Sequence, residues 1–225
     1  MKLLAIDTAL GACSAAVLDG AAVLSRRYEP MERGHAERIA PMVQEVMQEA
    51  GLAFGSLDRL AVTVGPGTFT GQRVGLAFMR GLHLALRRPL IGVTSLRAMA
   101  EAALVQTGAS RAAVMHDARR GEAYATFVVN RCVVVPVQIA TFADAVRAIL
   151  DAAPSLEEPV AFAGTAGRQA AQFCHAQGMC ALETDISTPD ALWVGRLAAA
   201  EPEPDCIPRP LYLRPPDARL PAGIN

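Results

Sequence analysis

The first third of the chain changes from a strand pattern of hydrophobic residues to a helical one. Residues 2–7 are a nearly continuous apolar run that ends at Asp7, and residues 12–18 and 21–28 flank a turn, which is typical of a β-meander. Apolar side chains then recur at i, i+3, i+4, i+7, i+8 and i+11. These positions are Ile39, Met42, Val43, Val46, Met47 and Ala50. They predict an amphipathic helix that ends near Gly51.

The next stretch alternates strands and helices. Residues 57–64 predict a strand that enters a glycine-rich turn, and Thr68 or Thr70 can cap a helix that runs to about Leu86. A strand over 89–93 and a helix over 95–106 follow. The first half is therefore expected to have the order βββαβαβα.

The second half repeats this order. We expect strands over 111–117, 122–130, 132–138 and 160–163, and helices from Thr141 to about 152 and near 166–177 and 189–200. Placing Asp7 on Asp117 also places Gly11 on Gly121. The matched order predicts a duplicated α/β fold with subdomains over 1–107 and 108–200. The proline-rich tail, 201–225, is expected to be extended or irregular and to pack back on the first subdomain.

The helix over 70–86 is apolar over most of its circumference. Val74, Phe78 and Leu82 make one row, which we expect to face the chain's own sheet. Met79 lies about 140° away and is therefore predicted to face a partner. A third group of small residues keeps the helix thin enough for another helix to approach closely: Ala77, Gly81 and Ala85.

Composition is compatible with a covered surface. Apolar residues make up 52% of the chain and charged residues only 19%. Either an alanine-rich composition or an interface with another subunit accounts for this excess. The net charge of −1 gives no overall basic excess of the kind a freestanding nucleic-acid binder needs, although local basic patches remain open.

The amino terminus and the cysteines predict a cytoplasmic protein. The first apolar stretch is short and contains Asp7, so it does not fit a secretory signal. No run approaches the ~18 apolar residues of a membrane span. The five cysteines are odd in number and lack a CxxC spacing, which favours reduced thiols.

The candidate cofactor site is the turn Gly65-Pro66-Gly67-Thr68-Phe69-Thr70-Gly71. A glycine-rich turn before a helix can direct backbone N–H groups at an anion, so Gly65 and Gly67 are candidates for cofactor binding. The turn has neither the Lys-Ser/Thr pair of a P-loop nor a complete dinucleotide fingerprint, so close helix packing remains an equal alternative. Asp7 can likewise hold a metal-bound water or cap a turn.

No metal or catalytic pattern is evident. His35 lacks a second ligand four residues on, because that position is Ile39. The group Cys174, His175 and Cys180 has only a weak metal-ligand spacing. We therefore predict no catalytic residues and no metal site.

Several segments together resemble one family. They are Leu4-Ala5-Ile6-Asp7-Thr8-Ala9, His35 with Ile39-Ala40-Pro41-Met42-Val43, Gly65 to Gly75, Ile91-Gly92-Val93-Thr94-Ser95-Leu96, Asp117-Ala118-Arg119-Arg120-Gly121-Glu122 and Tyr212-Leu213-Arg214. This set resembles the TsaB (YeaZ) family, whose members act in the synthesis of threonylcarbamoyladenosine beside the tRNA anticodon. The resemblance implies an actin-like (ASKHA) fold.

The resemblance also implies partners. It predicts a noncatalytic subunit that binds the catalytic paralogue TsaD, with the ATPase TsaE completing the assembly and tRNA bound through the complex. TsaD uses a His-x-x-x-His metal pair, of which this chain keeps His35 and replaces the second histidine by Ile39. No cofactor is expected on the chain alone, and ATP only in the complex. The helices over 35–50 and 70–86 would bind TsaD, or a second copy in the isolated homodimer, through Ile39, Met42, Val43, Val46, Arg73, Val74 and Met79.

Two other classes of function remain. One is a nucleotide-binding actin-like enzyme or a metallopeptidase-like protein, and the other is a purely structural oligomer. Contact of Arg209, Arg214 and Arg219 with tRNA also stays open.

Overall fold

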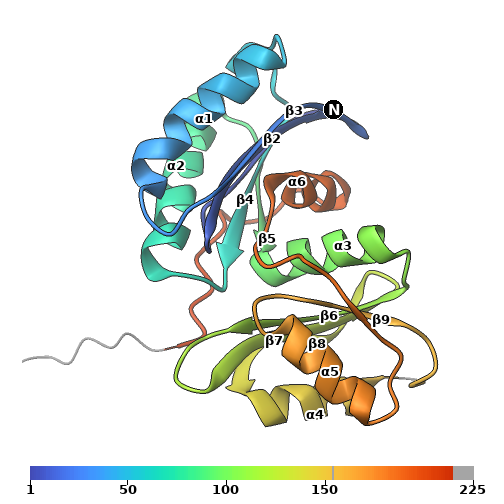
Figure 1. Ribbon diagram of the computed structural model, residues 1–225. Helices are drawn as coiled ribbons and strands as arrows, with labels where there is room; N and C mark the ends of the chain where they lie inside the picture. The colour runs from blue at the N-terminus through green and yellow to red at the C-terminus, as the bar shows by residue number, and fades with distance from the viewer. Residues whose placement is uncertain (154, 215–225) are drawn as a thin grey trace, which may run out of the picture.

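The computed structural model describes residues 1–153 and 155–214. Its first half forms a five-stranded sheet with three helices (Figure 1). The elements are β1 (Lys2–Asp7), β2 (Ala12–Asp19), β3 (Ala22–Pro30), α1 (His35–Glu49), β4 (Arg59–Gly65), α2 (Phe69–Leu86), β5 (Leu90–Thr94) and α3 (Ser95–Thr107). The expected order of elements is confirmed for this half.

The second half forms another five-stranded sheet. Its elements are β6 (Arg111–Asp117), β7 (Glu122–Val129), β8 (Cys132–Thr141), α4 (Phe142–Ala152), β9 (Val160–Ala163), α5 (Gly167–Ala176), β10 (Ala181–Glu183) and α6 (Ala191–Ala200). Strand β10 was not among the predicted strands, because three residues are too few to show a period. With β10 included, both halves have the order βββαβαβα.

The two sheets share one topology. The strand orders are β3-β2-β1-β4-β5 and β8-β7-β6-β9-β10. In each half the central strand has one antiparallel and one parallel neighbour. Strand β1 pairs antiparallel with β2 and parallel with β4, and β6 pairs antiparallel with β7 and parallel with β9. This is the duplicated, actin-like α/β fold.

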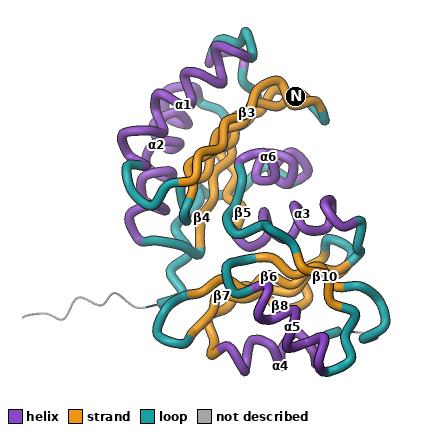
Figure 2. Tube along the Cα trace, viewed as in Figure 1, coloured by secondary structure: helices purple, strands orange, loops and turns teal. Residues whose placement is uncertain are grey.

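Helices and sheets alternate in layers (Figures 1 and 2). Helices α1 and α2 cover one face of the first sheet, and α3 and α6 lie between the two sheets. Helices α4 and α5 cover the outer face of the second sheet. One assignment is wrong: residues 191–200, predicted to belong to the second subdomain, form α6, which packs on β1 and β2 of the first sheet through Ala191, Val194 and Ala198.

After α6 the chain returns to the first half. Arg59 donates hydrogen bonds to the carbonyl oxygens of Ala198 and Glu201 (2.7 and 2.6 Å), which fixes the end of this helix. Further on, the Leu211 N–H donates to the Val64 carbonyl oxygen (2.7 Å), and Arg80 of α2 bonds the Pro208 carbonyl oxygen. We call residues 202–214 the strap. The rest of the predicted tail, 215–225, lies outside the described residues.

Candidate partner-binding surface

Asp7 ends β1 and is enclosed within the first half. Its side chain is 0% exposed, and one carboxylate oxygen accepts hydrogen bonds from the Thr63 hydroxyl (2.6 Å) and the Ala9 N–H (3.1 Å). The other oxygen, Oδ2, is buried without a partner. Burial raises the pKa of Asp7 to about 7, although the bond from Thr63 opposes this shift. Asp7 is therefore a buried carboxyl group with no exposed surface for a ligand.

The glycine-rich turn is closed by its own packing. A Cβ on Gly67 would lie 2.3 Å from the Ala9 carbonyl oxygen, and one on Gly71 would lie 2.1 Å from the Thr8 carbonyl oxygen. The Thr68 N–H donates to Ala9 (2.8 Å), and the Gly71 N–H donates to the Thr68 hydroxyl (3.1 Å), which caps α2. These glycines permit close packing of α2 on the turn after β1.

The same crowding applies to Gly65. Its φ of +103° favours glycine, and a Cβ there would meet the Gln72 side chain at 2.6 Å. Of the three cofactor candidates, Asp7 is fully buried, Gly65 is covered by Gln72 and Gly67 is pressed against Ala9. The geometry thus favours the packing alternative over an anion site at this turn.

His35 begins α1 and is held by the fold. It is 9% exposed, and its Nε2 is 3.0 Å from the Leu10 carbonyl oxygen. Ile39, one turn on, is 2% exposed within the core of the first half. Among residues 1–153 and 155–214, no three His, Cys, Asp or Glu side chains group in a way that could hold a metal ion.

The structure corrects the predicted partner residues on α1. The stripe Ile39, Met42, Val43 and Val46 lies in the chain's own core, where none of the four side chains is more than 2% exposed. The helical period identified the stripe correctly, but the stripe covers the first sheet. These four side chains have no surface with which to contact a partner.

The assignment of Met79 to a partner-facing side of α2 is wrong. Met79 is 0% exposed and belongs to the core of the first half, against which the partly buried Val74 also packs. The outward side is formed by the small residues Ala77, Gly81 and Ala85, all exposed. Val74, Phe78 and Leu82 border them; these three pack partly against the core of the first half and are partly accessible. Leu84 is 72% exposed. We call this outward side of α2, residues 74, 77, 78, 81, 82 and 85, the α2 face.

An exposed cluster lies at the first turn of α2. The rings of Phe69 and Tyr212 stack with centroids 5.5 Å apart, and the Arg73 guanidinium carbon lies 3.5 Å from the Phe69 centroid. Arg73 Nε also donates to the Tyr212 hydroxyl (2.8 Å). Phe69 is 51% and Tyr212 43% exposed. Stacked aromatic and arginine side chains of this kind are enriched at protein interfaces.

Only part of this surface was predicted from the sequence. Arg73 and Val74 were predicted, and the small residues of α2 had been recognised as a place of close approach. Tyr212 lies 139 residues from Arg73, so no local pattern could place it against α2. The α2 face is the candidate partner-binding surface, and the Phe69–Arg73–Tyr212 cluster lies at the first turn of the same helix.

No helix in the described ranges combines the length and hydropathy of a transmembrane segment.

Comparisons with known proteins agree with the motifs. Residues 28–189 match the family model "TsaD: tRNA N6-adenosine threonylcarbamoyltransferase". The Escherichia coli tRNA threonylcarbamoyladenosine biosynthesis protein TsaB is 42% identical over 124 residues, which are 55% of this chain and 53% of that protein. A Haemophilus influenzae TsaB is matched over 55% of its length. The chain thus spans about half the length of these two relatives.

Longer matches cover nearly the whole chain. An uncharacterized protein of Mycobacterium tuberculosis is 34% identical over 219 residues, which are 96% of this chain and 93% of that protein. The solved structure of YeaZ from Pseudomonas aeruginosa superposes with a TM-score of 0.72 at 28% identity, over 94% of this chain and 99% of that one. The chain belongs to the TsaB (YeaZ) family, a relative of the threonylcarbamoyltransferase TsaD, whose members act in tRNA threonylcarbamoyladenosine biosynthesis.

Proposed function

We propose that this chain is a noncatalytic subunit that binds and supports TsaD, with TsaE completing the assembly. The observation that carries the proposal is the contrast between the enclosed Asp7 site and the outward apolar α2 face. At the ends of β1 and β4 Asp7 is buried and the turn is closed by packing, whereas α2 presents a side on which a second helix can pack.

The shape of the α2 face supports a helical partner. Ala77, Gly81 and Ala85 succeed one another at intervals of four, so they make a thin strip along α2. Partly buried Phe78 and Leu82 stand beside the strip and can be covered further. Because TsaD and this chain share a family model, the corresponding helix of TsaD, or of a second copy of this chain, is the expected partner.

Ala77→Glu tests this proposal. A carboxylate buried without a counter-charge costs about 3 kcal/mol or more of association, so TsaD binding should weaken at least about 100-fold. The matched control is Ala143→Glu, which adds the same charge to an exposed position of α4. Both variants should keep the wild-type melting temperature, because neither side chain lies in a core.

The measurement is copurification of each variant with TsaD from the same genome, followed by determination of the dissociation constant. Wild type and Ala143→Glu should bind alike, and Ala77→Glu should fail to copurify. Folded Ala77→Glu with wild-type affinity would remove the α2 face from the proposal. Met79→Glu is unsuitable as a probe, since Met79 is a core residue and its replacement would unfold the first half.

The enzyme alternative gains no support from the site. Phosphoryl transfer needs an accessible phosphate cradle and a group that positions the nucleophile, whereas the turn at 65–71 is packed against Thr8 and Ala9. Titration of ATP into the isolated chain separates the two functions: the subunit proposal predicts no saturable heat of binding at millimolar ATP.

A further inference from the structure

The arginines of this chain differ in whether a carboxylate compensates their charge. Many pair with carboxylates: Arg26, Arg27, Arg38, Arg97, Arg111, Arg131, Arg168 and Arg214. Those along α2 and the strap differ, since among residues 1–153 and 155–214 no carboxylate oxygen lies within 4.0 Å of them. They are Arg73, Arg80, Arg87, Arg88 and Arg209. Arg33, Arg59, Arg119, Arg147 and Arg196 likewise have no carboxylate partner among the described residues. The α2 and strap arginines differ from these in that all five lie along one helix and the segment that packs on it.

The hydrogen bonds of the α2 and strap arginines leave their charge uncompensated. Arg73 donates to the Tyr212 hydroxyl, Arg80 to the Pro208 carbonyl oxygen and Arg88 to the Gly55 carbonyl oxygen (3.3 Å). All three acceptors are neutral. Arg87 and Arg209 are exposed. The guanidinium groups thus keep donors and full charge for a ligand, while their neighbours hold the side chains near α2.

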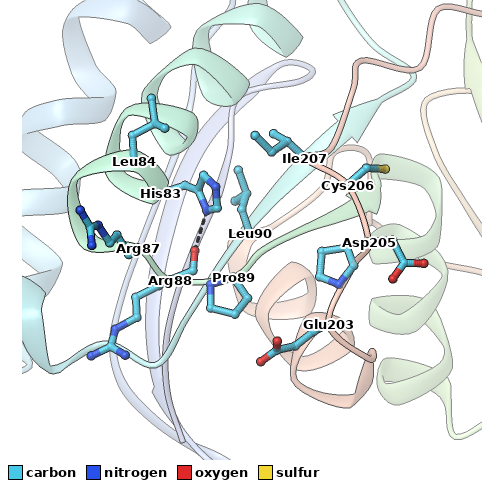
Figure 3. Close-up of a pocket in the computed structure, with 11 residues that line it drawn as sticks. His83, Leu84, Arg87, Arg88, Pro89, Leu90, Glu203, Asp205, Cys206 and Ile207 are labelled. Carbon is cyan, nitrogen blue, oxygen red and sulfur yellow. Dashed lines mark hydrogen bonds between the residues drawn. The ribbon is translucent and has the colours of Figure 1, made fainter.

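These arginines border a groove. Two adjoining depressions of about 680 and 460 Å³ lie between the second half of α2 and the strap, and they share His83, Leu84, Cys206 and Ile207. We call this hollow, bounded by residues 80–90 and 203–209, the arginine groove. Figure 3 shows His83 and Leu90 on one wall and Ile207 on the other, with the His83 ring bonded to the Arg88 carbonyl oxygen (2.7 Å).

The spacing of the arginines gives the groove a direction. Arg73 and Arg80 are seven residues apart on α2, so they lie on about the same side of the helix and about 10 Å apart. Arg87 is the left-handed residue that ends the helix (φ +54°). Arg209 lines the groove beside Arg80. At the Arg73 end the exposed rings of Phe69 and Tyr212 continue the surface. The result is a set of guanidinium groups from the first turn of α2 to its end, with an aromatic pair at the Arg73 end.

The opposite wall carries negative charge. Glu203 and Asp205 belong to the strap, and Figure 3 shows them apart from Arg87 and Arg88, which extend from the end of α2. These carboxylates would repel an anionic ligand from the strap side near the end of α2. A bound anion is therefore expected along the α2 wall and at the Arg80–Arg209 end.

We propose that the arginine groove binds the phosphate backbone of RNA, so that this chain itself contributes to tRNA binding by the assembled complex. The planar guanidinium group donates two parallel hydrogen bonds to phosphate, and unpaired bases stack on exposed aromatic rings such as Phe69 and Tyr212. The proposal rests on the proposed function for the identity of the RNA. It does not use the α2 face, which lies on another side of the helix.

Charge reversal at two exposed positions tests the groove. Arg87→Glu/Arg209→Glu removes two phosphate contacts without disturbing the bonds of Arg73, Arg80 or Arg88. The control is Arg147→Glu/Arg168→Glu, which changes the net charge equally on the exposed surface of α4 and α5 in the second half. The probe is an unmodified, fluorescently labelled tRNA transcript, titrated by anisotropy against the complex with TsaD between about 50 and 200 mM salt.

The groove variant should bind the transcript at least about tenfold more weakly at 100 mM salt. The slope of log affinity against log salt should become shallower by about 1.4 to 1.8, since each of the two lost phosphate contacts contributes about 0.7 to 0.9. The control should match the wild type. Glu203→Gln/Asp205→Asn should act in the opposite direction and tighten binding about two- to fivefold.

Three results would overturn the inference. Unchanged affinity and slope in the groove variant would show that RNA does not lie there. An equal loss in the control would show an effect of net charge alone. Loss of TsaD copurification by the groove variant would show that the groove binds an acidic segment of a protein.

Failure of the proposed function would look different. If the wild-type chain does not assemble with TsaD, the proposed function is wrong. The same titration on the chain alone, at about 20 mM salt, then tests whether the arginine groove binds RNA.

Discussion

The two halves of this protein share one frame of strands and turns but differ in what packs over it. In each, an aspartate ends the central strand and accepts a hydrogen bond from the N–H two residues on: Asp7 from Ala9 (3.1 Å) and Asp117 from Arg119 (2.7 Å). In each, the next parallel strand leads into a glycine of similar backbone conformation, Gly65 (φ +103°) or Gly164 (φ +98°). The duplicated frame therefore extends to the turns at the strand ends.

What covers these turns differs. Asp7 is fully buried beneath the start of α2, whereas Asp117 is exposed and borders a depression of about 390 Å³ with Glu122, Thr165 and Gln169. Glycines at positions 67 and 71 let α2 approach the turn after β1. The same fold thus makes a closed site in one half and an open one in the other, and the difference lies in the helix that follows.

Gly71→Ala should have the largest effect on this contrast. A Cβ at Gly71 would lie 2.1 Å from the Thr8 carbonyl oxygen, a backbone atom that cannot move without shifting β1. We expect a loss of about 3 kcal/mol in the free energy of unfolding, in spite of alanine's higher helix propensity. Urea denaturation measures this free energy.

The matched control is Gly167→Ala at the start of α5, where a Cβ would have its nearest contact at 3.4 Å. That variant should stay within about 1 kcal/mol of the wild type. Equal stabilities of the two variants would contradict the view that α2 closes the first site by close packing.

Asp7→Asn should have a smaller, pH-dependent effect. The pKa of Asp7 in the folded protein is about 7, above the value of about 4 in the unfolded chain. The folded state therefore holds the proton more tightly, so ionisation of Asp7 destabilises the fold as the pH rises from about 4 through 7. This shift corresponds to at most about 4 kcal/mol.

Asparagine keeps an oxygen for Thr63 and Ala9 and carries no charge, so Asp7→Asn should gain about 1–3 kcal/mol over the wild type at pH 8 and little at pH 4. Thermal and urea unfolding at both pH values measure the gain. Asp117→Asn, at an exposed position, should change stability by less than about 0.5 kcal/mol at either pH. A gain at Asp7 that does not depend on pH would contradict burial of the carboxyl group.

Local patterns predicted the elements well. The meander, the α1 stripe and the Thr68 cap each depend on residues within a few positions of one another, and the structure confirms them. The match of Asp7 with Asp117 also proved structural. Such features follow from helix and strand periods and from capping chemistry, which the sequence displays directly.

Tertiary placement was less predictable. Helix α2 is apolar on two sides, so its period could not decide whether Met79 or Val74 faces the sheet. Helix α6 follows the second half in sequence but covers the first sheet, and Tyr212 reaches Phe69 through the strap. These contacts join residues more than 100 positions apart, and no local signal encodes them.

The central claim is that this chain contributes a binding surface to the complex and that TsaD catalyses the reaction. The most direct test is the rate of tRNA threonylcarbamoylation by the reconstituted complex containing Asp7→Asn. The account predicts a rate within about twofold of the wild type, because Asp7 is buried and contacts no substrate. A fall of tenfold or more, with the variant folded and fully assembled, would place Asp7 in the reaction and contradict the account.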